Sequence, residues 1–315
     1  MPENGPLKAA VIGAGVFGHH HATKYKAFAG KGVELFAVAD PNPDMRAKAK
    51  AHHGCQVVAD WRELLGKVDL VSICSPAVTH AEIVRNFLKA GAHVLVEKPI
   101  ATSMEEAAEL VALSRQENRV LSVGHQERFV FARTGLLDLP QAPLEISCWR
   151  QGPWTGRGDD VSVVLDLMIH DLDLVHALVP DEVTEVRAEG LVEYGPHADE
   201  VFALLRFAGG AIAKLETSRV ANERKRGLRA IYADGLVEID FLSRTVRNTT
   251  PHALGALELG DPLGESVSGF VAAAQAGVDA LVTPEQAAQA LETALWVEEA
   301  SGVALPQPMR AVAGR

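Results

Sequence analysis

The chain is poor in cysteine and aromatic residues, has a deficit of positive charge and lacks any long apolar run. Its three cysteines, Cys55, Cys74 and Cys148, are odd in number and show no metal-ligand spacing, so we expect packing residues in a reducing compartment. A net charge of −11 argues against a nucleic-acid partner. No apolar stretch approaches the roughly 18 residues of a membrane span, and the amino terminus lacks the basic region of a signal peptide. These absences predict a cytoplasmic protein without a nucleic-acid or membrane partner.

The sequence does have enough apolar residues, 48% of 315, to fill the cores of two domains. From residue 7 to residue 123, short apolar runs alternate with segments of helical periodicity, which is the pattern of a doubly wound parallel sheet. The expected strands are residues 7–12, 33–39, 56–58, 70–73, 93–97 and 120–123. The expected helices are residues 17–28, 43–52, 79–90 and 104–117. Six strands with crossover helices predict a Rossmann domain over residues 1–124.

After residue 125 the pattern changes to longer extended runs separated by turn residues, which indicates hairpins and an antiparallel sheet. The expected strands are residues 144–149, 183–194, 201–207, 211–219, 228–233 and 236–240. A helix at residues 163–179 stops before Pro180, and helices at 266–278 and 283–301 close the chain. The predicted fold class is α/β, an N-terminal Rossmann domain with a parallel sheet plus a C-terminal α+β domain with an open, mostly antiparallel sheet. This second domain covers residues 125–315, and its last helices can pack back toward the Rossmann domain.

Three consecutive histidines, His19, His20 and His21, fall inside the first expected helix. Neighbouring residues of a helix face different directions because each residue turns the chain by about 100°. We therefore expect this triplet to have mixed exposure near the start of the helix.

The segment Gly13-Ala14-Gly15-Val16-Phe17-Gly18 follows the first expected strand and opens the first expected helix. Its glycines allow a tight turn, close approach of a pyrophosphate to the backbone and close helix packing, and the helix amino terminus attracts phosphate. The next strand ends at Asp40, where NAD-binding domains place the carboxylate that binds the ribose hydroxyls. Asp40 would repel a 2′-phosphate, so NAD is favoured over NADP, with Arg46 the nearest residue that could hold such a phosphate. The alternative is that Asp40 only caps the following helix.

Lys98 lies at the carboxyl end of the fifth expected strand, in the segment Glu97-Lys98-Pro99. Open parallel sheets bind ligands at this edge. The preceding strand ends in Cys74-Ser75-Pro76, with His80 close behind, so a second loop should face the same crevice. We expect both loops to contact the cofactor. Taken alone, Lys98 would be an ordinary surface lysine in a turn.

A second group of ionisable residues, Asp166, His170 and Asp173, has the spacing of one helix face. The rest of that helix is almost entirely apolar, and buried ionisable groups are costly unless they are paired or lie in a solvated cleft. An Asp–His pair satisfied inside the core is one interpretation. Beside a cofactor site, an active site is the better one: His170 would take the proton of an alcohol as hydride leaves, Asp166 would fix its tautomer, and Lys98 would stabilise the alkoxide. Lys98 would also repel a cation, so we expect no metal.

In order and spacing, these motifs resemble the glucose–fructose oxidoreductase, inositol dehydrogenase and rhizopine-catabolism family (Gfo/Idh/MocA) over essentially the whole chain. The resemblance implies that Lys98 is the catalytic lysine, that His170 transfers the proton beside Asp166, and that the Lys98-Pro99 peptide can be cis. It also implies NAD(P)-dependent oxidation of a CH–OH group and an open sheet face that packs in homodimers or homotetramers. The chain departs from the family at residues 159–164, where the family usually has glycines, and this departure affects the wall of the substrate pocket.

Three segments, residues 124–129, 163–171 and 218–220, resemble one subgroup, the bacterial UDP-N-acetylglucosamine 3-dehydrogenases of lipid A biosynthesis. This resemblance implies oxidation of the sugar 3-hydroxyl to a ketone. Arginines suit the diphosphate of such a nucleotide sugar, although each taken singly is equally typical of a protein surface. The alternatives are a dehydrogenase of a free sugar or inositol-type polyol, which needs no anion clamp, and a dinucleotide-binding module without catalysis. The predicted substrate-binding residues are Lys98, Arg128, Arg150, Arg157, Asp166, His170 and Arg219.

Overall fold

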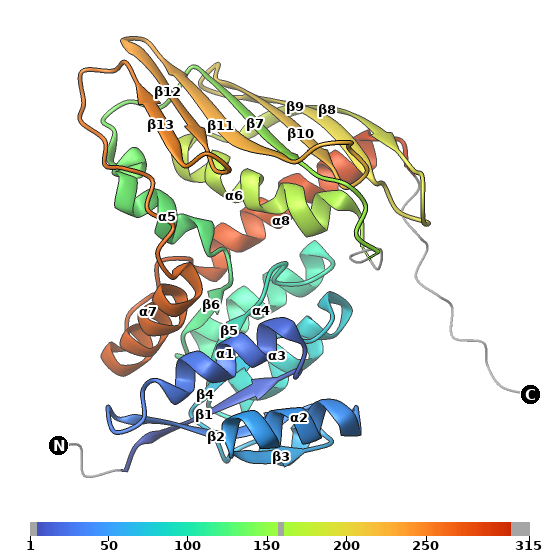
Figure 1. The fold of residues 1–315 in the computed structure, drawn as a ribbon, viewed down its shortest axis with the longest axis vertical. Coiled ribbons are helices and arrows are strands. Elements are labelled where there is room, and N and C mark those ends of the chain that lie inside the picture. Colours follow the sequence, from blue (N-terminus) through green and yellow to red (C-terminus); the bar gives the residue numbers. More distant parts are fainter. Residues whose placement is uncertain (1–4, 157–160, 304–315) are drawn as a thin grey trace, which may run out of the picture. The chain divides into compact units, whose positions relative to one another are not determined.

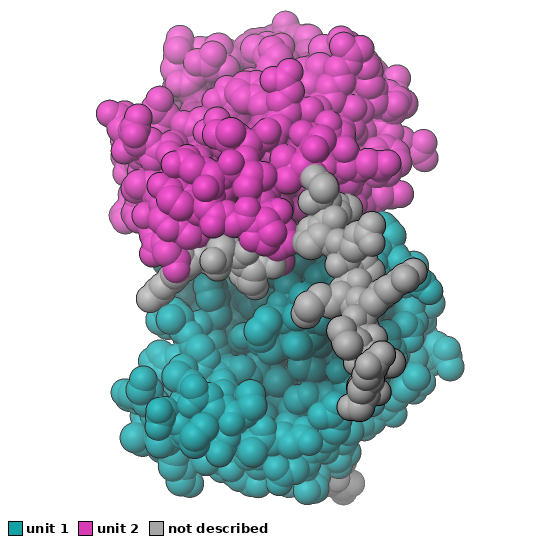
Figure 2. Space-filling model, turned by 90° about the vertical axis from the view of Figure 1, so that its right-hand side faces the viewer, with its two compact units in different colours: residues 1–133, 258–291 teal, residues 134–257, 292–315 magenta. Residues whose placement is uncertain are grey.

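The computed structural model describes residues 5–156 and 161–303, and the chain divides into two compact units, which are coloured separately in Figure 2. The first unit combines residues 1–133 with residues 258–291, and the second combines residues 134–257 with residues 292–315. The chain therefore returns to the first unit after it has completed the second sheet. Within the described ranges, no helix is both long and apolar enough to cross a membrane.

The first unit is built on a six-stranded parallel sheet (Figure 1). Its strands are β1 (Leu7–Ile12), β2 (Val33–Ala39), β3 (Gln56–Val58), β4 (Leu70–Ile73), β5 (His93–Val96) and β6 (Leu121–Val123), and its helices include α1 (Val16–Lys26), α2 (Pro43–His53), α3 (His80–Lys89), α4 (Met104–Gln116), α5 (Glu127–Thr134) and α7 (Pro262–Ala276). The strand order is β3-β2-β1-β4-β5-β6. Because the order reverses at β1, right-handed crossovers place α1 and α2 on one face and α3 and α4 on the other.

Apolar runs form the central strands because helices cover both faces of the sheet. Every residue of β4 is buried, and β5 is buried after its first residue. The distant helix α7 packs against α1: Tyr25 and Ala22 share a core cluster with Val267, Phe270 and the β1 residue Val11. This packing holds the strand ends in place, and the loops described below begin at those ends.

The second unit is built on a seven-stranded sheet with the order β13-β12-β11-β7-β10-β9-β8. Its strands are β7 (Glu145–Gln151), β8 (Val183–Leu191), β9 (Glu200–Phe207), β10 (Ile212–Ser218), β11 (Lys225–Tyr232), β12 (Gly235–Asp240) and β13 (Thr245–Asn248). Strands β7 and β10 run parallel, and the other neighbouring pairs are antiparallel. Along β9 one side is buried while Phe202 on the other is 52% exposed. That this open face packs against another copy stays a prediction.

A π-helical turn, Val164–Met168, leads into helix α6 (Ile169–Leu178) in the second unit. The division between the units falls inside the last helix, α8 (Pro284–Ala300). We predicted one long helix over about residues 163–179, and the structure has an unbroken helix over residues 163–178; the π turn at residues 164–168 is the feature that the sequence did not indicate. The wider turn places Asp166 in a π-helix, so the regular spacing of four residues between Asp166 and His170 does not define a single α-helical face. Turns of this kind occur often at functional sites.

Candidate active site

A pocket of about 460 Å³ lies at the carboxyl ends of β1, β2 and β4 in the first unit. The residues of the predicted cofactor site that line it are Gly13, Gly15, Asp40, Cys74, Ser75 and Pro76. Three segments far apart in the sequence therefore form one recess, at the edge of the sheet where parallel sheets bind nucleotides.

The glycine-rich turn has the geometry that a bound dinucleotide requires. Gly13 has φ +92°, and a Cβ there would lie 2.7 Å from the carbonyl oxygen of Cys74. A Cβ at Gly18 would overlap the carbonyl oxygen of Gly13, whereas one at Gly15 would meet no atom within 4 Å. Helix α1 begins at Val16, and its N-cap Gly15 provides no side-chain hydrogen bond, so the first backbone N–H groups of the helix can bind phosphate.

Asp40 belongs to this recess and does not cap the next helix. Its Oδ2 accepts a hydrogen bond from the Ala14 backbone N–H at 2.7 Å, and its Oδ1 accepts from the Asn42 N–H at 2.8 Å. The cap of α2 is the Asn42 side chain, which accepts from the Asp44 and Met45 N–H groups. Arg46 donates to the backbone carbonyls of Asp40 and Pro41, both at 2.8 Å.

Lys98 is half-buried and lies two residues after the end of β5, and the Lys98-Pro99 peptide is cis. On one side of it, the carbonyl of Pro99 lies 2.7 Å from His80 Nδ1, while His80 Nε2 lies 2.9 Å from the carbonyl of Ser75. His80 is 1% exposed, and burial lowers its pKa, an effect that the two carbonyl contacts oppose. One imidazole thus joins the two loops that we expected to face the cofactor.

The second unit holds the other proposed catalytic residues. Asp166 and His170 are both half-buried, and Asp173 is 1% exposed. Directly before the π turn, the hydroxyl of buried Ser162 donates to Glu298 of α8, and Ser162 Oγ accepts from the Leu165 N–H at 3.3 Å. Burial raises the pKa of Glu298. The start of the helix that carries His170 is thereby attached to α8.

The predicted arginines have mostly internal contacts. Arg150 forms a two-pronged ion pair with Asp171, at 3.0 and 2.7 Å. Arg219 donates to Asp199 at 2.6 Å and to the carbonyl of Val161 at 3.0 Å, and its side chain is 6% exposed.

Arg128 lies on α5 and is 6% exposed, and Arg157 lies outside the described residues. Substrate binding by any of these arginines stays a prediction. In the part of the chain that the structure describes, no group of three or more histidine, cysteine, aspartate or glutamate side chains is placed to hold a metal ion.

Comparison with known proteins places this geometry in a family. Residues 7–125 match the model of an oxidoreductase family with an NAD-binding Rossmann fold, and residues 139–238 match the C-terminal domain of the same Gfo/Idh/MocA group. The chain belongs to this oxidoreductase family. The predicted family, the fold class and the assignment as an enzyme acting on CH–OH groups are confirmed.

Individual relatives narrow the comparison within the Gfo/Idh/MocA family. A UDP-N-acetylglucosamine 3-dehydrogenase from Acidithiobacillus ferrooxidans is 34% identical over 244 residues, which are 76% of each chain. A solved structure of the enzyme of that name from the same organism superposes with a TM-score of 0.86 at 32% identity, covering 94% of this chain and 97% of the other. A myo-inositol 2-dehydrogenase from Thermotoga maritima is 29% identical over 234 residues, 68% of this chain and 69% of the relative.

The sequence analysis missed the partners of Glu97, the residue before Lys98. These partners are His21 of α1 and Gln126, whose side-chain nitrogens lie 2.8 and 3.1 Å from Glu97 Oε1. The sequence does contain a pattern that indicates burial of His21: it shares the helical spacing of Gly18, Ala22 and Tyr25, the other buried residues of α1. The predicted mixed exposure of the triplet is confirmed, since His19 and His20 are exposed and His21 is 1% exposed.

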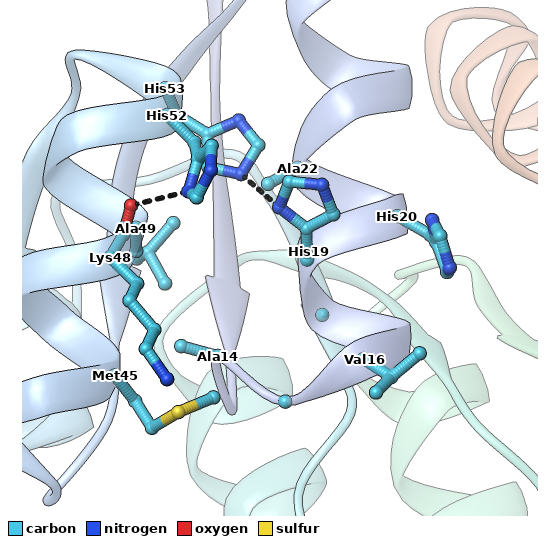
Figure 3. Close-up of a pocket in the computed structure, with 13 residues that line it drawn as sticks. Ala14, Val16, His19, His20, Ala22, Met45, Lys48, Ala49, His52 and His53 are labelled. Atoms are coloured by element: carbon cyan, nitrogen blue, oxygen red, sulfur yellow. Dashed lines mark hydrogen bonds between the residues drawn. The ribbon is translucent and has the colours of Figure 1, made fainter.

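His19 and His20 line a second pocket of about 280 Å³ between α1 and α2, which Figure 3 shows. His53 Nε2 lies 3.1 Å from His19 Nδ1, and His52 Nδ1 donates to the carbonyl of Lys48 at 2.8 Å. The His20 ring lies beside that of His19, with ring centres 5.7 Å apart. This outer histidine group (His19, His20, His52 and His53) is the counterpart to the buried His21.

Proposed function

We propose that this family member oxidises the 3-hydroxyl of UDP-N-acetylglucosamine to a ketone and passes the hydride to NAD. The observation that carries the proposal is the 34% identity to a UDP-N-acetylglucosamine 3-dehydrogenase over three quarters of both chains. A dinucleotide pocket with Lys98 at the next strand end supplies the chemistry that such a reaction needs.

The pocket at the glycine-rich turn fits the cofactor. Gly13 and Gly15 let the backbone approach a pyrophosphate, and the uncapped start of α1 supplies N–H donors. Asp40 accepts hydrogen bonds, which suits two ribose hydroxyls and disfavours the 2′-phosphate of NADP. Arg46 already donates to two backbone carbonyls, so NAD is the proposed cofactor. When bound, NAD supplies the nicotinamide carbon that accepts hydride.

The protein's own residues handle the proton and the developing charge. His170 takes the proton of the sugar hydroxyl at a ring nitrogen as the C3–H bond breaks, and Asp166 stabilises the resulting imidazolium. The Lys98 ammonium stabilises the negative charge that develops on the sugar oxygen. The products are a 3-keto sugar, reduced cofactor and one proton held on His170, so electrons and protons balance.

Four arginines were predicted to bind the diphosphate of the substrate. Arg150 and Arg219 each have an aspartate partner, so an anion would compete with Asp171 or Asp199 for them. Arg128 is the described arginine among them that lies in the first unit, on α5. We propose Arg128 and Arg150 as the first residues to replace when nucleotide-sugar binding is tested.

The test is NADH formation at mildly alkaline pH with NAD and one of three substrates: UDP-N-acetylglucosamine, myo-inositol or free glucose. Saturable turnover with the nucleotide sugar and weak turnover with the other two is the expected result. Turnover with the free polyols alone would overturn the substrate assignment and leave the oxidoreductase class intact. A parallel series with NADP should require a higher cofactor concentration for the same rate.

A further inference from the structure

His21 is the buried end of the triplet and belongs to a continuous chain of hydrogen-bonded side chains in the first unit. Its Nε2 lies 2.8 Å from Glu97 Oε1, and its Nδ1 lies 3.0 Å from Ser72 Oγ. Ser72 Oγ in turn lies 2.9 Å from the hydroxyl oxygen of Tyr25. His21, Ser72 and Tyr25 are 1%, 0% and 0% exposed, so the chain connects α1 and β4 to the end of β5 without solvent.

The donors in this chain can all point one way. A carboxylate only accepts, so His21 donates from Nε2 to Glu97, and a neutral imidazole then accepts at Nδ1 from Ser72. Ser72 accepts in its turn from Tyr25, whose pKa is raised by burial, so the phenol keeps its proton. Each hydrogen bond in the chain then has one proton between its two heavy atoms, and hydrogen bonds aligned in this way strengthen one another.

The Glu97 carboxylate is held from three sides. Besides His21, Gln126 donates to Oε1 at 3.1 Å, and Gly124 lies so close that a Cβ there would be 2.8 Å from Oε2. Burial by itself would raise the pKa of Glu97, but the hydrogen bond from His21 and the electrostatic interactions with His21, Lys98 and His80 outweigh burial, and the net direction is down. Glu97 is therefore a fixed, ionised carboxylate in the residue next to Lys98.

The charged and titratable groups around Glu97 come from several elements. His21 lies on α1, His80 on α3 and Lys98 on the loop after β5, and each favours the carboxylate form of Glu97. Cys74 follows β4, and burial and the Glu97 charge raise its pKa, so it is an uncharged thiol.

We propose that His21 is a positioning residue for Lys98: it holds the Glu97 carboxylate, and Glu97 fixes the start of the lysine side chain and keeps a negative charge beside the ammonium. The inference rests on the proposed function, in which Lys98 contacts the substrate oxygen. His80 holds the Pro99 carbonyl on the other side, so both neighbours of Lys98 are attached to buried imidazoles.

The first readout is turnover in His21→Ala and His21→Gln, with the exposed neighbour His20→Ala as matched control. We expect His21→Ala to lower kcat about 10- to 100-fold, as small misplacements of a catalytic group do, with little change in the KM for NAD. Without its donor, Glu97 ionises at higher pH, so the acid limb of the kcat profile should move upward. The glutamine amide can donate to Glu97, so His21→Gln should restore both quantities in part, whereas loss of folded protein alone would leave the pH profile in place.

The second readout needs no substrate and therefore separates this inference from the proposed function. The unprotonated amine of Lys98 reacts with an amine-reactive reagent, and mass spectrometry of the Lys98 peptide gives its rate against pH. A neighbouring negative charge favours the unreactive ammonium form of an amine, so once the Glu97 carboxylate is no longer held beside Lys98, labelling at neutral pH should become roughly 3- to 10-fold faster in His21→Ala. Glu97→Gln, which keeps the side-chain shape, should do the same if His21→Ala does not fold.

The outcomes are distinct. Faster Lys98 labelling in His21→Ala or Glu97→Gln, with His20→Ala unchanged, supports the inference even if none of the tested sugars is oxidised. The absence of sugar oxidation would then count only against the proposed function. Labelling that is unchanged in both variants would overturn the positioning role whatever the sugar assay gives.

Discussion

Two groups of histidines in the first unit, which meet at α1, have opposite surroundings. His21 is buried and donates to a carboxylate, whereas the neighbouring His19 is exposed and has imidazoles as partners, with ring centres 4.9 Å from His53 and 5.3 Å from His52. The residue type is the same and the positions are two residues apart. The partner of each histidine determines what it does. An N–H donor such as His21 fixes the position of a carboxylate, whereas in a group of imidazoles a protonated ring disfavours protonation of its neighbours.

The inner group, His21 and His80, lies beside the proposed catalytic lysine. The outer group lines the separate pocket between α1 and α2. His21 and His80 hold the residues on either side of Lys98. In the outer group, the pKa of His53 is lowered by burial first and then by the charges of His19, Lys26 and His52. Changes to the inner group should therefore alter catalysis, and changes to the outer group should alter the dependence of stability on pH.

The largest effect should follow from removing the group that the inner histidines hold. Lys98→Ala should lower kcat about 100- to 1000-fold, the loss expected for one charge-stabilising donor, because nothing else at that position can carry an ammonium. NADH binding, followed by its fluorescence, should change little. His20→Ala, in the outer group, is the matched control and should stay close to wild type. Unchanged turnover in Lys98→Ala would remove the basis of the proposed mechanism.

A smaller effect is expected where Glu97 meets the backbone. Gly124→Ala should destabilise the fold by about 1–3 kcal/mol, as overpacking does, because the new Cβ would lie 2.8 Å from the carboxylate. Urea unfolding measures this difference. Gly269→Ala in α7 is the control: its Cβ would meet Phe129 at 3.7 Å, an ordinary contact, and the helix should gain up to about 1 kcal/mol. Equal effects at the two glycines would show that the carboxylate is not held tightly.

The smallest effect belongs to the outer group. The pKa of His53 is lowered in the folded protein, so the unfolded chain binds that proton more readily. The contribution of His53 is fully present above the unfolded pKa of about 6.5 and is lost as pH falls from there toward the folded value. In His53→Gln the melting temperature should therefore fall less steeply between neutral and mildly acidic pH than in the wild type. Parallel curves for the two proteins would contradict a titrating outer group.

The sequence predicts the first unit more closely than the second because its signals are local. Strands β1, β2, β3 and β4 have the predicted bounds, since each is a short apolar run between turn residues. The glycine-rich turn and Asp40 likewise follow from spacing along the chain. Helix α5 and strand β13 were missed, because an eight-residue helix and a four-residue strand with exposed polar residues leave little periodic pattern.

The site depends on contacts that no local pattern contains. His21 is 51 residues from Ser72 and 76 residues from Glu97, so its role is visible only after the sheet has formed. The partners of Arg150 and Arg219 lie 21 and 20 residues away, and we had assigned both arginines to the substrate. The π turn at Asp166 is also absent from the apolar pattern of its helix, which is equally compatible with an unbroken α-helix.

The most direct test of the central claim is the fate of the hydrogen on C3 of the sugar. UDP-N-acetylglucosamine carrying deuterium at C3 would be incubated with the protein and NAD, and the reduced cofactor would be analysed by mass spectrometry. The account predicts deuterium in the reduced cofactor together with a 3-keto product, and loss of both in Lys98→Ala. Reduced cofactor without deuterium, or no reduction with this substrate under conditions where another sugar is oxidised, would contradict it.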